Sequence, residues 1–149
     1  HSPGHLAYIT PDNVCYTGDA IMSHDVLLGS KLPFMEDIDG SLLSMETLRN
    51  TDCTYYIAAH KGVIPQAEIC RLIDENIQKE IALYDLLRPL LQTRIPVDTA
   101  VDRYLALLGV QGERAKTEYI RFSALSRLEA LTNAGEYIIE DGFIFPSLL

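Results

Sequence analysis

The sequence lacks several features that would assign its class at once. No apolar run approaches the roughly 18 residues that a membrane-spanning helix requires, and no segment has the charged start and apolar middle of a signal peptide. Basic residues are scarce, with 12 Lys+Arg against 21 Asp+Glu and a net charge of −9. Because a net anion repels phosphate backbones and anionic lipids, this charge balance disfavours non-specific binding to nucleic acids or to anionic membranes.

Cysteine is scarce as well, and the chain does not begin with methionine. Cys15, Cys53 and Cys70 are odd in number, widely spaced and form no CxxC pair. A secreted disulfide framework usually has an even set, so we expect reduced thiols that fill core positions in a cytosolic protein. Because the chain opens at His1, we expect it to be a piece of a longer polypeptide.

What is present is a globular composition. Of the 149 residues, 48% are hydrophobic and 22% are charged, which excludes intrinsic disorder. The length suits one ordinary domain, or half a domain with an appendage.

Hydrophobic periodicity divides the chain near residue 65. Up to that point, short apolar runs alternate with turn signals, a pattern typical of strands. The runs predict a hairpin and a third, buried strand over residues 6–9, 14–17 and 54–59. A helix is expected over 41–49, with Asp39 or Ser41 as its N-cap. The remaining segment, 21–38, reads as irregular.

Residues 66–149 instead show the 3.6-residue apolar period of amphipathic helices. Three helices are predicted, over residues 66–92, 97–108 and 113–133. Pro89 should bend or end the first helix, and Gly135 should cap the last. Asp141-Gly142 then predicts a terminal hairpin. Three helices followed by a hairpin is the order of a winged-helix-like module.

Residue types that bind metals stand at the ends of the predicted strands in three strings. The strings are His1-Ser2-Pro3-Gly4-His5, Thr17-Gly18-Asp19-Ala20 and Ala58-Ala59-His60-Lys61-Gly62. Imidazole and carboxylate groups hold Zn(II) and other first-row metals, and loops at strand ends can direct them toward one point. Each string alone is more often an ordinary loop or turn. Their order and strand context together favour a metal site.

This ordered set resembles the second half of the metallo-β-lactamase-fold hydrolases, the superfamily of glyoxalase II and many metal-dependent esterases, lactamases and nucleases. The third motif of the family commonly reads His-(Thr/Ser)-Pro-Gly-His, as residues 1–5 do. Its fourth motif matches Gly18-Asp19, and its fifth, His-x-Gly, matches His60-Lys61-Gly62. The helical tail more loosely resembles the winged-helix-like extension of some bacterial members.

The resemblance implies a dinuclear metal site. His1 would ligate the first metal, Asp19 would bridge the two as the catalytic residue, and His60 would ligate the second. His5 would support these groups without binding metal. Two divalent ions, zinc foremost with iron or manganese as alternatives, would activate water against an ester, thioester, amide or phosphodiester in a small-molecule substrate.

One family signature, His-x-His-x-Asp-His, is absent from this sequence. Because a dinuclear site needs those four ligands, we expect the isolated chain to bind metal poorly and to be inactive. The implied fold is mixed α/β. Residues 1–65 form the C-terminal half of an αβ/βα sandwich, and residues 66–149 form the helical, winged-helix-like tail. With only half of the αβ/βα sandwich present, one face of the sheet would be exposed to solvent. We therefore expect this face to pack against the missing amino-terminal half or against a second copy, as in a homodimer.

Two other classes stay open. A nucleic-acid-binding module would use the basic residues of the third predicted helix, which outnumber acidic residues such as Glu118 and Glu129. These basic residues are Arg114, Lys116, Arg121 and Arg127. The tail as a whole is acidic, with 9 basic against 13 acidic residues, which disfavours this reading. The other class is a non-catalytic scaffold whose histidines are incidental and whose Tyr55 and Tyr56 pack in a core rather than wall a pocket.

Overall fold

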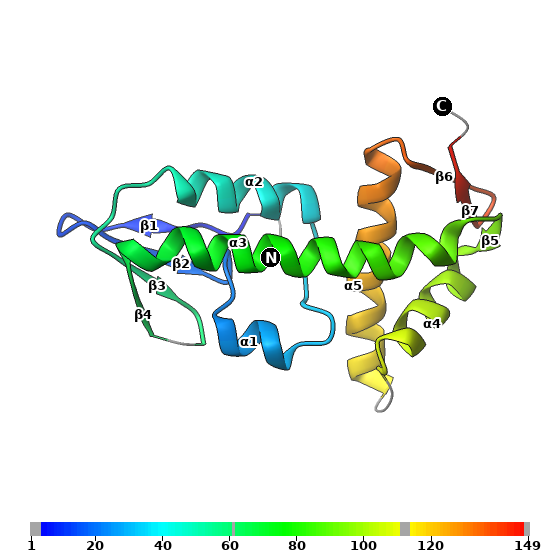
Figure 1. Ribbon diagram of the computed structural model, residues 1–149, viewed down its shortest axis with the longest axis horizontal. Coiled ribbons are helices and arrows are strands. Elements are labelled where there is room, and N and C mark those ends of the chain that lie inside the picture. The colour runs from blue at the N-terminus through cyan, green and yellow to red at the C-terminus, as the bar shows by residue number, and fades with distance from the viewer. Residues whose placement is uncertain (1–3, 61, 111–113, 148–149) are drawn as a thin grey trace. The chain divides into compact units, whose positions relative to one another are not determined.

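The computed structural model describes residues 4–60, 62–110 and 114–147, which form two compact units (Figure 1). The first unit contains the described residues up to Ser30 and Asp37–Glu80. The second contains Lys31–Glu36 and the described residues from Ile81 onward. The division therefore falls inside a long helix, later than the change in periodicity near residue 65.

A four-stranded sheet of order β1-β2-β3-β4 forms the base of the first unit. Its strands are β1 (Tyr8–Ile9), β2 (Val14–Gly18), β3 (Tyr55–Ala58) and β4 (Val63–Pro65). β1 and β2 form the predicted antiparallel hairpin, β3 runs parallel to β2, and β4 runs antiparallel to β3. The first three strands confirm the sequence prediction, whereas β4 was not predicted.

Helices connect and follow these strands. They are α1 (His24–Gly29), α2 (Ile38–Arg49) and α3 (Gln66–Leu87). A parallel pair such as β2 and β3 needs a crossover connection, and α1 and α2 provide it; α1 lies in the segment that we expected to be irregular. The predicted caps of α2 are wrong. The helix begins at Ile38, so the cap is Asp37, whose carboxylate accepts the N–H of Gly40 at 2.9 Å.

The two faces of the four-stranded sheet differ sharply in exposure. Side chains alternate between faces along a strand. Cys15, Tyr56 and Ile64 are paired across β2, β3 and β4, and all three are buried. The alternate row crosses all four strands through Tyr8, Tyr16, Ile57 and Val63. In that row Tyr8 is 61% exposed and Val63 is 62% exposed, so this face is apolar and uncovered.

The second unit begins within α3 and continues through a 3₁₀ turn at Arg88–Leu91, which contains Pro89 as the sequence predicts. It holds α4 (Val97–Leu107), α5 (Arg114–Asn133), β5 (Ile95–Pro96), β6 (Tyr137–Glu140) and β7 (Phe143–Pro146). The three antiparallel strands have the order β5-β7-β6. The helices and the hairpin confirm the prediction, but β5 lies between two predicted helices, where no strand was expected.

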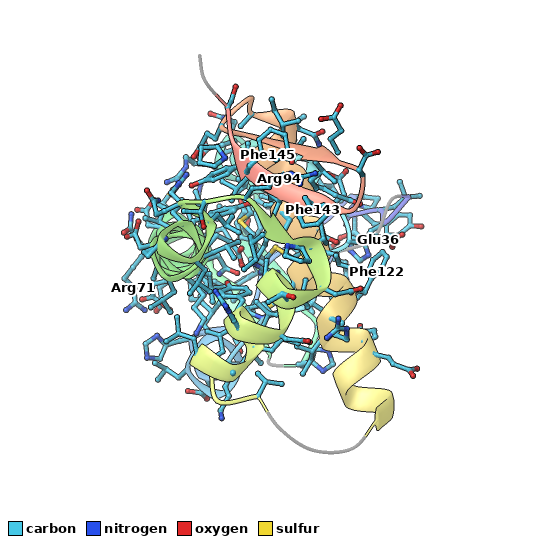
Figure 2. The ribbon with its side chains drawn as sticks, turned by 90° about the vertical axis from the view of Figure 1, so that its right-hand side faces the viewer. Glu36, Arg71, Arg94, Phe122, Phe143 and Phe145 are labelled. Carbon is cyan, nitrogen blue, oxygen red and sulfur yellow. The ribbon has the colours of Figure 1, made fainter. Side chains whose placement is uncertain are left out.

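The core of the second unit draws on its helices and its sheet alike. Leu87, Tyr104, Leu128 and Ile144 are each at most 1% exposed and belong to one apolar cluster. The hydroxyl of Tyr104 donates to the carbonyl of Leu83 at 3.2 Å, so its buried polar atom is satisfied. At the sheet, the guanidinium of Arg94 lies 3.8 Å from the ring centroid of Phe143, and Figure 2 labels both residues.

Two predictions from the residue pattern can be checked at this point. Cys15 and Cys53 are free and buried, as expected of core fillers, whereas Cys70 is exposed, so the prediction is wrong for that residue. Burial raises the pKa of the Cys15 thiol, which keeps it protonated and unreactive.

Among the described residues, no helix has the length and apolar character needed to cross a bilayer.

Candidate functional site

The site forms where two parallel strands end. Asp19 directly follows β2, and His60 comes two residues after β3. Since parallel strands present their carboxyl ends at the same sheet edge, the two turns become neighbours. A hydrogen bond from the N–H of Ala59 to the carbonyl of Gly18, at 2.9 Å, joins them directly.

The structure brings the predicted Asp19 and His60 side chains together. Nε2 of His60 lies 3.3 Å from Oδ1 of Asp19. The side chain of Asp19 is about one third exposed, at 32%, and that of His60 is 71% exposed. His60 also has a φ of +71°, a left-handed conformation that non-glycine residues rarely adopt and that costs about 1–2 kcal/mol. Asn13 and Asp141, in the turns of the two hairpins, also have a positive φ, so the conformation of His60 is typical of a tight turn.

His5 lies against the same turn. Its Nε2 is 3.0 Å from the carbonyl oxygen of Thr17, the residue before Gly18. Gly18 has a φ of +54°, and a Cβ built on it would collide with the His5 ring. Three of the four predicted site residues, His5, Asp19 and His60, are therefore gathered at one sheet edge.

The remaining histidines are His1 and His24. His1, the predicted ligand of the first metal, lies outside the described residues, as does Lys61. His24 stands at the start of α1, where its Nδ1 lies 2.9 Å from Oε2 of Glu75 on α3. His24 is therefore paired with a carboxylate on α3 and does not belong to the candidate site.

The donor chemistry of the Asp19–His60 pair can be compared with the demands of a metal ion. Zinc binds imidazole nitrogen and carboxylate oxygen at about 2.0–2.2 Å, so neighbouring tetrahedral ligand atoms lie about 3.4 Å apart. The observed 3.3 Å fits two ligands of one ion. Within the described part of the chain, no group of three or more His, Cys, Asp or Glu side chains is placed to hold a metal. The pair therefore fits as part of a ligand set.

An apolar hollow that the sequence analysis did not identify adjoins the site. It has a volume of about 280 Å³ on the uncovered side of the sheet, and Gly18 and Ala59 form its edge next to the two turns. Its remaining lining is Leu6, Tyr8, Tyr16, Ile57 and Ala58. One tyrosine on each strand of the first hairpin, Tyr8 and Tyr16, was the signal in the sequence that could have found it. Of the tyrosines singled out earlier, Tyr56 is fully buried and Tyr55 is exposed, so only Tyr56 packs as a core residue.

The two basic side chains of α5 that the structure describes, Arg121 and Arg127, are engaged within the second unit. Arg121 bonds Asp98 at 3.0 Å and also contacts Asp102. Arg127 is fully buried and donates to the carbonyl of Ser123 at 2.8 Å, so it does not lie on an exposed face that could contact nucleic acid. The pattern misled because an arginine on an amphipathic helix is ordinarily exposed. The side chains of Arg114 and Lys116 lie outside the described residues.

Comparison with known proteins bears on the fold alone. No protein-family model and no curated protein matches the sequence. Among solved structures, the chain is similar to a metallo-β-lactamase family protein from Thermus thermophilus, with a TM-score of 0.68 and 19% identity. The match covers 96% of this chain and 45% of that one, so the chain spans less than half the length of its neighbour. The predicted relation to the metallo-β-lactamase fold is thus supported, and the described residues form a mixed α/β structure with two sheets and five helices.

Proposed function

We propose that this chain is the C-terminal portion of a metal-dependent hydrolase of the metallo-β-lactamase fold. The observation that carries the proposal is the Asp19–His60 pair, 3.3 Å apart at the carboxyl ends of two parallel strands. The similarity of fold to a metallo-β-lactamase family structure supports it. Without that similarity, an Asp–His contact at a sheet edge would be weaker support for a metal site, because such contacts also occur as ordinary surface ion pairs.

Each residue has a distinct role in this proposal. The Asp19 carboxylate has two oxygens and can bridge two cations, while His60 offers one nitrogen on the same side. His1 is proposed as the ligand of the first ion. When bound, two divalent ions (zinc foremost, iron or manganese as alternatives) supply hydroxide and stabilise an oxyanion. The substrate would be a small ester, thioester, amide or phosphodiester.

The uncovered sheet face supports a second part of the proposal, that this half of the fold packs against another layer. Tyr8, Tyr16 and Val63 are all between 45% and 62% exposed along one row. Exposed apolar surface of this kind marks a packing interface. We assign it to the amino-terminal half of the same polypeptide, since the structural neighbour is more than twice as long as the region matched. The ligands missing here would come from that half, so the isolated chain should not hydrolyse substrate.

For the tail, we propose a winged-helix-like module that serves as a substrate lid or dimer surface. The order α3, β5, α4, α5, β6 and β7, with a three-stranded antiparallel sheet, supports this assignment. Binding to duplex DNA is disfavoured because Arg121 and Arg127 already have protein partners. We place the protein in the cytosol, where thiols such as the free Cys15 and Cys53 stay reduced.

Zinc titration of the chain by calorimetry tests the metal site directly. We expect weak binding that Asp19→Asn or His60→Asn reduces at least tenfold, the factor that about 1.4 kcal/mol represents. His24→Asn is the matched control, because His24 also faces a carboxylate but belongs to no proposed site. An equal loss in all three variants, or no loss in any, would contradict the proposal.

A further inference from the structure

We infer that Asn76, on helix α3, is a positioning residue that fixes the loop carrying Asp19. The inference rests on the role proposed for Asp19. It starts from a polar residue in an apolar row. Ile69, Leu72 and Ile73 are buried along one face of α3, and Asn76 continues that face at helical spacing while only 1% exposed. Asparagine is a poor helix former and is costly to bury without hydrogen bonds, so its place in this row has a specific cause.

That cause is a set of three hydrogen bonds to the backbone. Oδ1 of Asn76 accepts the N–H of Met22 at 2.9 Å. Nδ2 donates to the carbonyl of Met22 at 2.9 Å and to that of Leu72 at 2.8 Å. One donor and two acceptors face the amide, so the positions of its oxygen and nitrogen are fixed by the partners. Asn76 therefore pairs with both backbone groups of Met22, as a neighbouring strand would.

The paired residue lies three positions after Asp19. The two residues between them, Ala20 and Ile21, are buried, at 8% and 1% exposed. The N–H of Ala20 donates to the carbonyl of Thr17 at 3.1 Å, which closes the turn at the end of β2. The loop is thus held at Thr17 on one side and by Asn76 on the other, while the side chain of Asp19 remains 32% exposed.

The segment that holds the loop is the one that follows His60. Strand β4 pairs with β3 and leads directly into α3. Asn76 therefore joins the chain after β2, which carries Asp19, to the chain after β3, which carries His60. A second contact joins the same segments at the surface, where Nδ1 of His24 lies 2.9 Å from Oε2 of Glu75. The His24 side chain is 59% exposed, so this contact is the natural control for the buried one.

Amide hydrogen exchange in the full chain tests whether Asn76 holds the loop. Asn76→Leu keeps a similar side-chain volume and removes all three hydrogen bonds. We expect at least roughly fivefold faster exchange at Met22 and Ala20, with the amide of Leu108 in the second unit as internal reference. His24→Asn should leave Ala20 close to wild type. Unchanged exchange at Ala20 in Asn76→Leu would overturn the inference.

Asn76→Asp tests the donor separately and serves where Asn76→Leu does not fold. At neutral pH the introduced carboxylate is buried and faces two carbonyl oxygens, which raises its pKa. Protonation then restores a hydroxyl donor. The urea midpoint of Asn76→Asp should therefore approach that of the wild type as the pH falls from about 7 to about 5. A difference from wild type that stays constant over this range contradicts the contacts on which the inference depends and would overturn it.

Zinc affinity connects the loop to the site, with Ile73→Ala as the control for a general loss of stability. Ile73 lies on the same helix and is fully buried, but it has no polar group that could bond the loop. We expect several-fold weaker zinc binding in Asn76→Leu and near wild-type affinity in Ile73→Ala, measured where both variants remain folded. Equal losses in the two variants would overturn the positioning role.

Two further outcomes separate this inference from the proposed function. Wild-type affinity in Asn76→Leu, where Asp19→Asn has lost binding, overturns the positioning role and leaves the proposed function standing. If the wild-type chain binds no zinc but Ala20 exchanges faster in Asn76→Leu, the fixing of the loop by Asn76 is supported and the proposed function fails.

Discussion

The sheets of the two units differ in whether the side chains on their faces are buried. In the second unit, Ile95, Tyr137 and Ile144 of the small sheet are buried in one cluster with residues of three helices. In the first, the four-stranded sheet buries one row of side chains and leaves the other in solvent. Complete secondary structure therefore does not imply a complete core. The second unit has its own enclosed core, whereas the first presents a face ready for another layer.

The charged side chains near the two sheets also differ in exposure. In the second unit they form cross-element pairs such as Arg88 with Glu136, at 2.9 Å, and Arg121 with Asp98. In the first, Asp19 and His60 meet at the end of the sheet with much of the imidazole still exposed. The first unit also has a cross-element pair, Arg49 with Asp74 at 2.7 Å, so the exposure of the Asp19–His60 pair is what sets the sheet end apart.

The strongest test of this comparison uses a matched pair of tyrosines. Tyr104 is fully buried in the second unit, whereas Tyr8 is 61% exposed on the uncovered sheet face. Tyr104→Ala should lower the free energy of unfolding by about 3–5 kcal/mol, as large-to-small aromatic substitutions in cores do. Tyr8→Ala should cost less than about 1 kcal/mol. Urea denaturation followed by far-UV circular dichroism measures both.

Similar losses from the two substitutions would break the comparison, because they would mean that Tyr8 is already covered in solution, for instance by a second copy. Repeating the measurement over a tenfold range of protein concentration separates these cases. Stability that rises with concentration indicates self-association through the face.

The second test probes the uncovered face with an apolar dye such as ANS. We expect the chain to bind the dye, and Tyr16→Ser and Val63→Ser to reduce its fluorescence, because both residues lie in the exposed row. Leu107→Ser is the control, since Leu107 is 54% exposed but lies on α4 in the second unit. A larger loss of fluorescence in Leu107→Ser would mean that the dye binds the second unit and would contradict the expectation that it binds the exposed sheet face.

The sequence predicted elements with a clear period or a strong turn signal beside them, as for the two-residue β1, and missed short elements that have neither. Helix α3 follows from apolar residues spaced along 22 positions, whereas β4 has three residues and β5 has two. Such short strands exist only because a neighbouring strand pairs with them, which is tertiary information. The same limit explains Arg127, whose burial depends on packing partners that lie far away in the chain.

For the site, strand order and motif spacing were enough to select Asp19 and His60. The sequence could not reveal that β2 and β3 are parallel, and the 3.3 Å separation depends on that pairing. Nor could it show that the His5 ring fills the space beside Gly18. Glycine before an acidic residue reads simply as a turn, and the positive φ of Gly18, at +54°, is visible in three dimensions alone.

The smallest expected effect concerns the ion pair of the second unit. Arg88 donates two hydrogen bonds of 2.9 Å to Glu136, and this contact lowers the pKa of the carboxyl below its ordinary value of 4.5. The unfolded chain then binds more protons than the folded chain in acid. The pair's contribution is therefore full above about pH 4.5 and is lost as the pH falls through the lowered pKa. Both side chains are more than one third exposed, so the contribution is about 0.5 kcal/mol or less.

Glu136→Gln should accordingly reduce stability slightly at pH 7 and match the wild type near pH 3, as measured by urea midpoints across that range. Glu140→Gln removes the same charge from the same hairpin outside the Arg88 pair, and should show a smaller pH-dependent difference. If the two variants titrate identically, the effect reflects net charge alone, and the pair does not hold the hairpin to the helix end. If Glu136→Gln alone loses its penalty in acid, the charges of the second unit serve its structure, unlike the exposed pair at the sheet edge of the first.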